Sequence, residues 1–414
     1  MKIRLLIAVF VATCFFSACQ QQDENIEEIK TIKLDEKSTQ VVEADNQFGL
    51  ELFQKISASE TEAENIMISP LSVALALAMT YNGAEGETKT AMEKTLKKHG
   101  LTADEINASY KTLVNALISL DSKVILEIAN AIYYRDNFDV EKNFVSLNRE
   151  YYDAEVTPLD FNATGEALAT INGWVAEKTH DKIENIINEI SPTHVMFLLN
   201  AIYFKGIWQK EFNEKSTIEQ DFYLDNEDRI QVEMMCKTDT LEYTSNNLFS
   251  AVKMPYGSGN YNMLVFLPET GKTTKDIISE LNTQNWNKWQ KAFQLTKDLQ
   301  IQFPKFKFEY EKKLNDVLAE MGMGVAFTGA ADFRGINKGG GLKIDYVKHK
   351  TFIEVKEEGT EAAAVTVVAI ELTSAGPGKS YIPFYVNRPF LFAITEKDTG
   401  AILFIGEVKR PVSD

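Results

Sequence analysis

We interpret the chain as one large α+β domain with mixed sheets, and three observations support a single globular unit. The chain has 414 residues, which is enough to bury a large core within a single unit. Its hydrophobic share of 44% is ordinary for a globular protein. No internal repeat or low-complexity block interrupts the body, and the scattered Pro and Gly residues indicate turns rather than a second linker.

Residues 1–18 have the features of a secretory signal. Two basic residues precede an apolar run from residue 5 to residue 16, which is too short to span a membrane as a stable helix. Residues 16–19, Phe-Ser-Ala-Cys, resemble a bacterial lipobox, although Phe16 stands where that motif usually has Leu. We expect cleavage before Cys19 and lipidation of Cys19. The alternative is an ordinary signal peptide with an incidental cysteine.

Residues 19–45 are expected to form a lipidated flexible tether, and residues 46–414 the folded domain. The stretch from Gln20 to Thr39 is polar and acidic and lacks a clean apolar period. An anchor of two or three acyl chains would hold strongly, because each buried methylene contributes about 0.8 kcal/mol. We expect an exported protein, either lipid-anchored to a bacterial cell envelope, where it could be surface-exposed, or extracellular.

The charge of the chain argues against nucleic-acid partners. Loss of Lys2 and Arg4 with the signal lowers the 43 basic residues to 41 against 60 acidic ones, which changes the formal charge from −17 to −19. Such a surface repels nucleic acid and anionic membranes. We expect contact with a membrane only through the lipid, and we expect a monomer. The short basic cluster of Lys94, Lys97, Lys98 and His99 is interpreted as a solvated helix end rather than a polyanion site.

Cysteine usage predicts a fold without an internal disulfide. Cys14 leaves with the signal and Cys19 would carry lipid, so only Cys236 remains in the domain. A lone cysteine in a strand-like run usually serves packing.

No motif for catalysis, metal binding or cofactor binding is found. The four histidines, at positions 99, 180, 194 and 349, belong to no HExxH motif and to no Cys/His pair with zinc spacing. A Gly-x-Ser-x-Gly elbow and a phosphate-binding loop are also missing from the sequence. We expect no enzyme, no metal and no cofactor. A Ser/His hydrolase stays as an alternative, because a triad is defined in space.

The stretch from Glu357 to Ile370 is typical of a strand that can be inserted into a sheet. Side chains alternate between the two faces of a strand. The even positions from Thr360 to Leu372 are small or apolar, whereas Glu361 and Glu371 both fall on the odd face. The β-branched run 365–368 favours the extended state. On parity alone, a helix rich in Ala or an ordinary amphipathic strand remains possible.

Six ordered motifs surround this stretch and together resemble the serpins, a family of suicide inhibitors of proteases. They lie at residues 65–74, 199–208, 263–268, 347–355, 387–392 and 403–406. The resemblance covers residues 46 to 412 and is specific because all six occur in order. It implies a fold of three β-sheets with eight to nine helices and an exposed reactive loop.

The resemblance also implies roles for individual residues. It places a hinge at Glu357, Gly359, Thr360, Ala362, Ala363 and Ala364. It places a polar shutter beneath the main sheet at Ser69, Ser72, Asn200 and His349, and Trp208 at the breach where the hinge enters. Buried polar groups that exchange partners allow two strands to part without leaving a donor unpaired. The alternatives are unrelated core polar residues and, for Trp208, a plain core aromatic.

In the mechanism that the resemblance implies, a protease cleaves the loop and the freed segment enters the main sheet with the acylated protease attached. About 14 residues at about 3.3 Å each give a strand on the order of 46 Å long. Counting from Glu357 places the cleaved bond at Thr373–Ser374, or at Leu372–Thr373 if the count slips by one. Counting back from the motif at Asn387 points instead near Lys379.

The residues near these bonds indicate the class of target. They suit elastase-, subtilisin- or chymotrypsin-like endopeptidases or papain-like cysteine proteases, and Lys379 would suit a trypsin-like enzyme. The alternatives are a non-inhibitory serpin acting as a binding or carrier lipoprotein, and an adhesin on the same scaffold.

Overall fold

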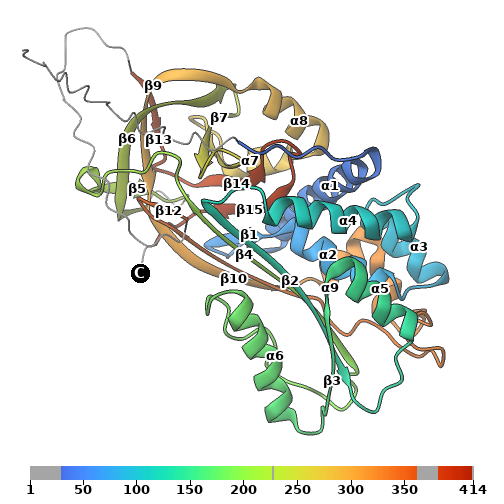
Figure 1. Cartoon of the computed structure of the whole chain (residues 1–414). Helices are drawn as coiled ribbons and strands as arrows, with labels where there is room; N and C mark the ends of the chain where they lie inside the picture. The colour runs from blue at the N-terminus through green and yellow to red at the C-terminus, as the bar shows by residue number, and fades with distance from the viewer. Residues whose placement is uncertain (1–28, 226–227, 361–380, 413–414) are drawn as a thin grey trace, which may run out of the picture.

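The computed structural model describes residues 29–225, 228–360 and 381–412 of the chain (Figure 1). Within these ranges lie nine α-helices, in keeping with the expected eight to nine. They are α1 (Glu36–Ser59), α2 (Pro70–Tyr81), α3 (Gly86–Thr95), α4 (Ala103–Ile118), α5 (Lys142–Tyr152), α6 (Thr164–Lys178), α7 (Thr274–Ser279), α8 (Thr283–Ala292) and α9 (Asn315–Leu318).

One sheet has six strands and contains the predicted hinge. Its strands follow the order β10 (Phe306–Lys313), β11 (Lys348–Val355), β12 (Gly359–Thr360), β4 (Met196–Ile207), β2 (Val124–Arg135) and β3 (Glu155–Leu159). The long antiparallel pair β2–β4 forms its centre, and α6 contacts both strands from one face (Figure 1). Helix α2 packs on β4.

The other strands form a single sheet of nine. Its order is β1 (Asn65–Ile68), β15 (Ile402–Val408), β14 (Phe390–Glu396), β8 (Tyr261–Pro268), β7 (Phe249–Tyr256), β6 (Arg229–Ser245), β9 (Gln294–Pro304) and β13 (Ile382–Tyr385), with β5 (Ile218–Tyr223) also paired to β6. The expected α+β class is confirmed. Two hydrogen-bonded sheets replace the expected three within the described chain, because the long strand β6 pairs with β5 and β9 and, through residues 242–245, with β7.

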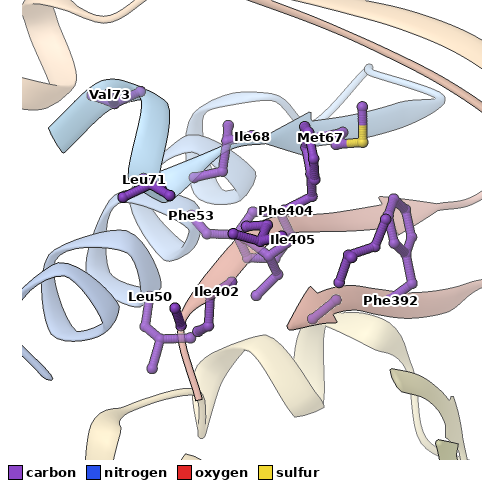
Figure 2. Packing of buried hydrophobic residues seen from close by; sticks show 14 of the residues in the cluster. Leu50, Phe53, Met67, Ile68, Leu71, Val73, Phe392, Ile402, Phe404 and Ile405 are labelled. Atoms are coloured by element: carbon purple, nitrogen blue, oxygen red, sulfur yellow. The ribbon is translucent and has the colours of Figure 1, made fainter. Parts of the chain in front are cut away.

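The main core lies between helices α1 and α2 and the strands β1, β14 and β15 (Figure 2). Leu50 of α1 lies beside Ile402 of β15 there, and Phe53 of α1 lies beside Ile405; all four are buried. Gly406 allows this close packing, because a Cβ atom at that position would lie 2.7 Å from the carbonyl oxygen of Ile66. The glycine of the motif at 403–406 therefore allows β15 to pack closely against β1.

Helix α1 corrects the predicted boundary between tether and domain. We expected a flexible tether up to residue 45, but α1 begins at Glu36, with Asp35 as its N-cap. Val41, Val42 and Asp45 are buried. The prediction was wrong here because the first turn of α1 is polar and acidic. Most of the buried positions of this helix begin only at Val41, so the local pattern did not indicate a helix. The predicted signal and lipidation site lie outside the described residues.

Candidate functional site

Two residues of the predicted hinge already form a strand in the six-stranded sheet. Gly359 and Thr360 make up β12, which is antiparallel to β4, with Thr360 opposite Gly206. On its other side, Thr360 is paired with Val355 of β11. The chain after β11 therefore turns back and starts a new strand between β11 and β4.

Close packing at this point explains the glycine of the hinge. A Cβ atom on Gly359 would lie 2.1 Å from the carbonyl oxygen of Gly206 and 2.7 Å from the Cα atom of Ile207. The φ angle of Gly359 is +154°, a conformation that residues with a side chain rarely adopt. The backbone of β12 can approach β4 this closely only because Gly359 has no side chain.

Thr360 points into an aromatic pocket. Its side chain is 3% exposed, and its Oγ1 lies 2.5 Å from the hydroxyl oxygen of Tyr256. The ring of Tyr256 stacks on Trp208 with 4.4 Å between ring centroids. Trp208 in turn donates a hydrogen bond from Nε1 to the carbonyl oxygen of Lys356 (3.0 Å). Trp208 thus lies beside the predicted hinge.

Tyr256 was missed by the sequence analysis. Its role depends on contacts with Trp208 and Thr360, residues far from it along the chain. Burial raises the pKa of Tyr256 well above its usual range, so the hydroxyl stays protonated. It remains available to Thr360 as a neutral hydrogen-bond partner.

The side chains of Thr217 and Lys305 hold Glu357, the first hinge residue. Its carboxylate accepts a hydrogen bond from Thr217 Oγ1 (2.7 Å) and lies 3.5 Å from Lys305 Nζ. Its carbonyl oxygen accepts from the backbone N–H of Phe212 (2.9 Å). The buried carboxylate is therefore paired, as a charged group in the interior must be.

A slot continues beyond Thr360 between β4 and β11. No ladder joins these two strands directly in the described part of the chain. A small cavity of about 20 Å³ lies next to Thr360 between Tyr203 and Phe352. Further along lies a larger cavity of about 170 Å³, lined by β4, by residues 342–350 and by α2. The space that a further strand would need is thus partly present.

Three predicted shutter residues meet at the start of α2. Ser69 is the N-cap of that helix, and its Oγ accepts a hydrogen bond from the backbone N–H of Ser72 (3.2 Å). The backbone N–H of Ser69 donates to Nε2 of His349 (3.0 Å). Burial lowers the pKa of His349 to about 4. The imidazole is therefore neutral, and Nε2 is free of a proton and can accept.

The fourth shutter residue lies across the slot from the other three. Asn200 on β4 donates from Nδ2 to Oδ1 of Asn130 on β2 (2.8 Å). Asn130 donates in turn to the carbonyl oxygen of Tyr152 (2.8 Å). The Oδ1 atom of Asn200 is buried and has no hydrogen-bond partner. Asn200, Ser72 and His349 nevertheless line the same large cavity.

Asn130 was also missed, because nothing in the local sequence distinguishes it from an ordinary strand residue. It lies opposite Asn200 in the β2–β4 ladder. The remaining predicted site residues lie outside the described ranges. They are Cys19, Ala362, Ala363, Ala364, Leu372, Thr373, Ser374 and Lys379.

The described residues form neither a metal-binding cluster nor a membrane-spanning helix. No group of three or more His, Cys, Asp or Glu side chains is arranged there to hold a metal ion. None of the helices in these ranges is long and apolar enough to cross a membrane.

The comparison with protein families decides the family. The model of the serpin (serine protease inhibitor) family matches residues 43–411. The chain belongs to the serpin family. Serpins are mostly protease inhibitors, and some are binding proteins instead.

Relatives of this serpin come from several lineages. Intracellular coagulation inhibitor 2 of Tachypleus tridentatus is 33% identical over 412 residues, which cover 98% of this chain and 97% of that protein. A serpin-like protein of Thermococcus kodakarensis is 34% identical over 376 residues, covering 90% and 86%.

Solved structures show the same fold. The thermophilic serpin tengpin in its native state has a TM-score of 0.81 at 34% identity, covering 92% of this chain and 96% of that chain. Human thyroxine-binding globulin, in complex with thyroxine, has a TM-score of 0.82 at 26% identity, covering 91% and 100%.

Proposed function

We propose that this serpin is a suicide-substrate inhibitor of serine or cysteine endopeptidases. The observation that carries the proposal is the position of β12, which is paired with β4 through both of its residues and with β11 through Thr360. Cleavage of the loop would release the chain beyond Thr360 to continue this strand along the slot. The start of the inserted strand then exists before cleavage.

The residues that would follow Thr360 suit such a slot. The even positions from 362 to 372 share the parity of Thr360 and carry no charge. A charged side chain on that face would lose several kcal/mol of hydration on entering the core. Rapid insertion is what separates an inhibitor from a substrate, because the acyl-enzyme must be trapped before water hydrolyses it.

The covalent step belongs to the protease. Its Ser or Cys nucleophile attacks the carbonyl carbon of the scissile bond, and the new amine on the far side leaves with a proton. We place this bond at Thr373–Ser374, with Leu372–Thr373 as the adjacent alternative and a site near Lys379 as the trypsin-like one. Elastase-, subtilisin- and chymotrypsin-like enzymes and papain-like enzymes are the proposed targets.

Location is a further part of the proposal. A chain exported by residues 1–18 and lipidated at Cys19 would hold the inhibitor at a bacterial cell envelope. There it would protect the cell against proteases of a host or competitor.

The test mixes the purified protein with elastase, subtilisin, trypsin and papain and examines the products on a denaturing gel. A band at the summed mass that survives boiling is expected with at least one of them, and the mass of the released peptide locates the bond. Cleavage by all four without such a band would contradict inhibition. That result would favour a binding or carrier role, such as the thyroxine complex of thyroxine-binding globulin exemplifies.

A further inference from the structure

The segment that links α6 to β4, residues 179–195, crosses the slot between β4 and β11; we call it the connector. Near one end, Lys182 and Ile183 line the small cavity next to Thr360. Further along, Ile186 and His194 line the large cavity. A strand that extends from Thr360 would therefore have to run beneath the connector.

Side chains of β2 form hydrogen bonds with the connector. Nε2 of His180 lies 3.0 Å from a carboxylate oxygen of Glu127 on β2. Arg135, at the end of β2, donates to the carbonyl oxygen of His194 from Nε (3.2 Å) and from a second nitrogen (3.1 Å). These contacts tie the connector to the β2–β4 half of the sheet.

On the side of β11, the connector contacts Phe352 and Asp345. Lys182 lies over the ring of Phe352 at 5.1 Å from the ring centroid. Nε2 of His194 lies 3.1 Å from Oδ2 of Asp345, three residues before β11 begins. The backbone N–H of Ser191 donates to Nδ1 of His194 (3.1 Å), so Nε2 carries a proton and donates to Asp345.

Burial fixes the His194 side of the hydrogen bond with Asp345. The side chain of His194 is 7% exposed, whereas that of Asp345 is 52% exposed. The imidazole is held edge-on between the rings of Phe197 and Tyr346, at 5.4 and 5.8 Å between centroids. The donor is therefore fixed, and the acceptor is the partner that can move away.

The register of β12 places this bond at the far end of the slot. Thr360 is opposite Gly206, and the antiparallel ladder continued one residue at a time brings residue 372 opposite His194. An added strand widens a sheet by about 4.8 Å at each level that it reaches. A hydrogen bond of 3.1 Å between the two flanks cannot absorb such a displacement unless one partner moves.

We propose that His194 and Asp345 form a clasp that holds the far end of the slot closed and opens in the last stage of strand insertion. This inference rests on the proposed inhibitory function and adds positioning residues to it. The clasp slows spontaneous insertion of the uncut loop, which would consume the inhibitor without capturing a protease. It contributes nothing to the form with a fully inserted strand, because the strand has displaced one of its partners.

The test uses Asp345→Ala, since the half-exposed carboxylate can be removed without opening a core cavity. The matched control is Glu184→Ala, which removes an exposed carboxylate of the connector. Each protein is incubated uncut at a fixed elevated temperature, and its loss of complex formation with protease is followed in time. We expect Asp345→Ala to lose this ability at least about tenfold faster than the parent, the change due to one hydrogen bond to a charged group, and the control to match the parent.

A second measurement separates a clasp from a merely structural bond. The melting temperature of each protein is compared before and after the loop is cut by limited proteolysis. We expect Asp345→Ala to melt lower than the parent when uncut and at the same temperature when cut. Equal loss in both forms, or unchanged inactivation kinetics, overturns the clasp.

Failure of the proposed function would look different. In that case the parent protein itself would form no boiling-resistant complex and would gain no thermal stability after cleavage. A His194→Asn, Asp345→Ala double variant adds a further check on the pair, because coupled partners give a double effect close to that of either single change.

Discussion

The basic cluster at residues 94–99 contains one side chain, Lys98, that is buried although we expected the cluster to be solvated. We interpreted the cluster as a solvated helix end, but Lys98 is 1% exposed, and its Nζ lies 2.7 Å from Oδ1 of Asp45. Tyr110 donates to the same oxygen (2.8 Å). Burial lowers the pKa of Lys98 and raises that of Asp45. No local pattern announces this pair, because its partners are 53 residues apart.

His349 should make stability depend on pH. Burial lowers its pKa from 6.5 to about 4, so the unfolded chain binds a proton on this residue between those values while the folded chain does not. Stability is therefore expected to fall as the pH drops from about 6.5 to about 4, by up to about 3 kcal/mol from this group. Above pH 6.5 the group adds no slope.

Urea unfolding at pH 7 and pH 5 measures this dependence. Carboxylates titrate in the same range, so the comparison is with His349→Gln, whose side-chain oxygen can still accept from the N–H of Ser69. The variant should lose less stability between the two pH values than the parent. An identical loss in both proteins would argue that His349 is not buried as a neutral ring.

Thr360 is the hinge residue at which a charged substitution tests strand insertion most directly. Its even parity and its contact with Tyr256 place it inside the sheet. Thr360→Arg is expected to convert the inhibitor into a substrate, because burying an ionised side chain costs several kcal/mol. Thr360→Ser, which keeps the hydroxyl for Tyr256, is the control and should still trap protease. The readout is the ratio of complex to cleaved protein on the gel, and full trapping by the Arg variant would falsify the insertion account.

At the scale of elements, the position of α1 makes a prediction about truncation. Removal of residues 1–45 would delete the N-cap Asp35, the buried Val41 and Val42, and the partner of Lys98. Removing one partner of a buried ion pair alone costs about 3–5 kcal/mol. We expect this truncated protein to unfold at much lower urea concentration than one that lacks only residues 1–28. Equal midpoints would show that α1 is not part of the folded domain before residue 46.

The two-residue strand β12 shows what periodicity can and cannot establish. Parity along residues 357–372 predicted which face of an inserted strand would be uncharged, because alternation is a local property. The degree of insertion could not be predicted, since it depends on Gly206 and Tyr256. Both lie in other strands, so only the assembled sheet shows that the first two residues are already paired.

For the whole molecule, the motifs predicted the family and the fold class well. Ser69 contacts His349, and Trp208 contacts Lys356 next to the predicted hinge, since such motifs record tertiary contacts that a single segment does not reveal. The unpredicted features, among them the Asn130–Asn200 bond and the join of two sheets through β6, arise from pairings between distant strands. A pattern of propensities within one segment carries no information on such pairings.

The central claim is that the cleaved loop fills the slot between β4 and β11. Amide hydrogen exchange of the parent protein, measured before and after the loop is cut, tests it most directly. We predict that cutting strongly slows exchange in residues 196–207 and 348–355, because a new strand pairs with both flanks of the slot. Unchanged exchange in these two strands after complete cleavage would contradict the account.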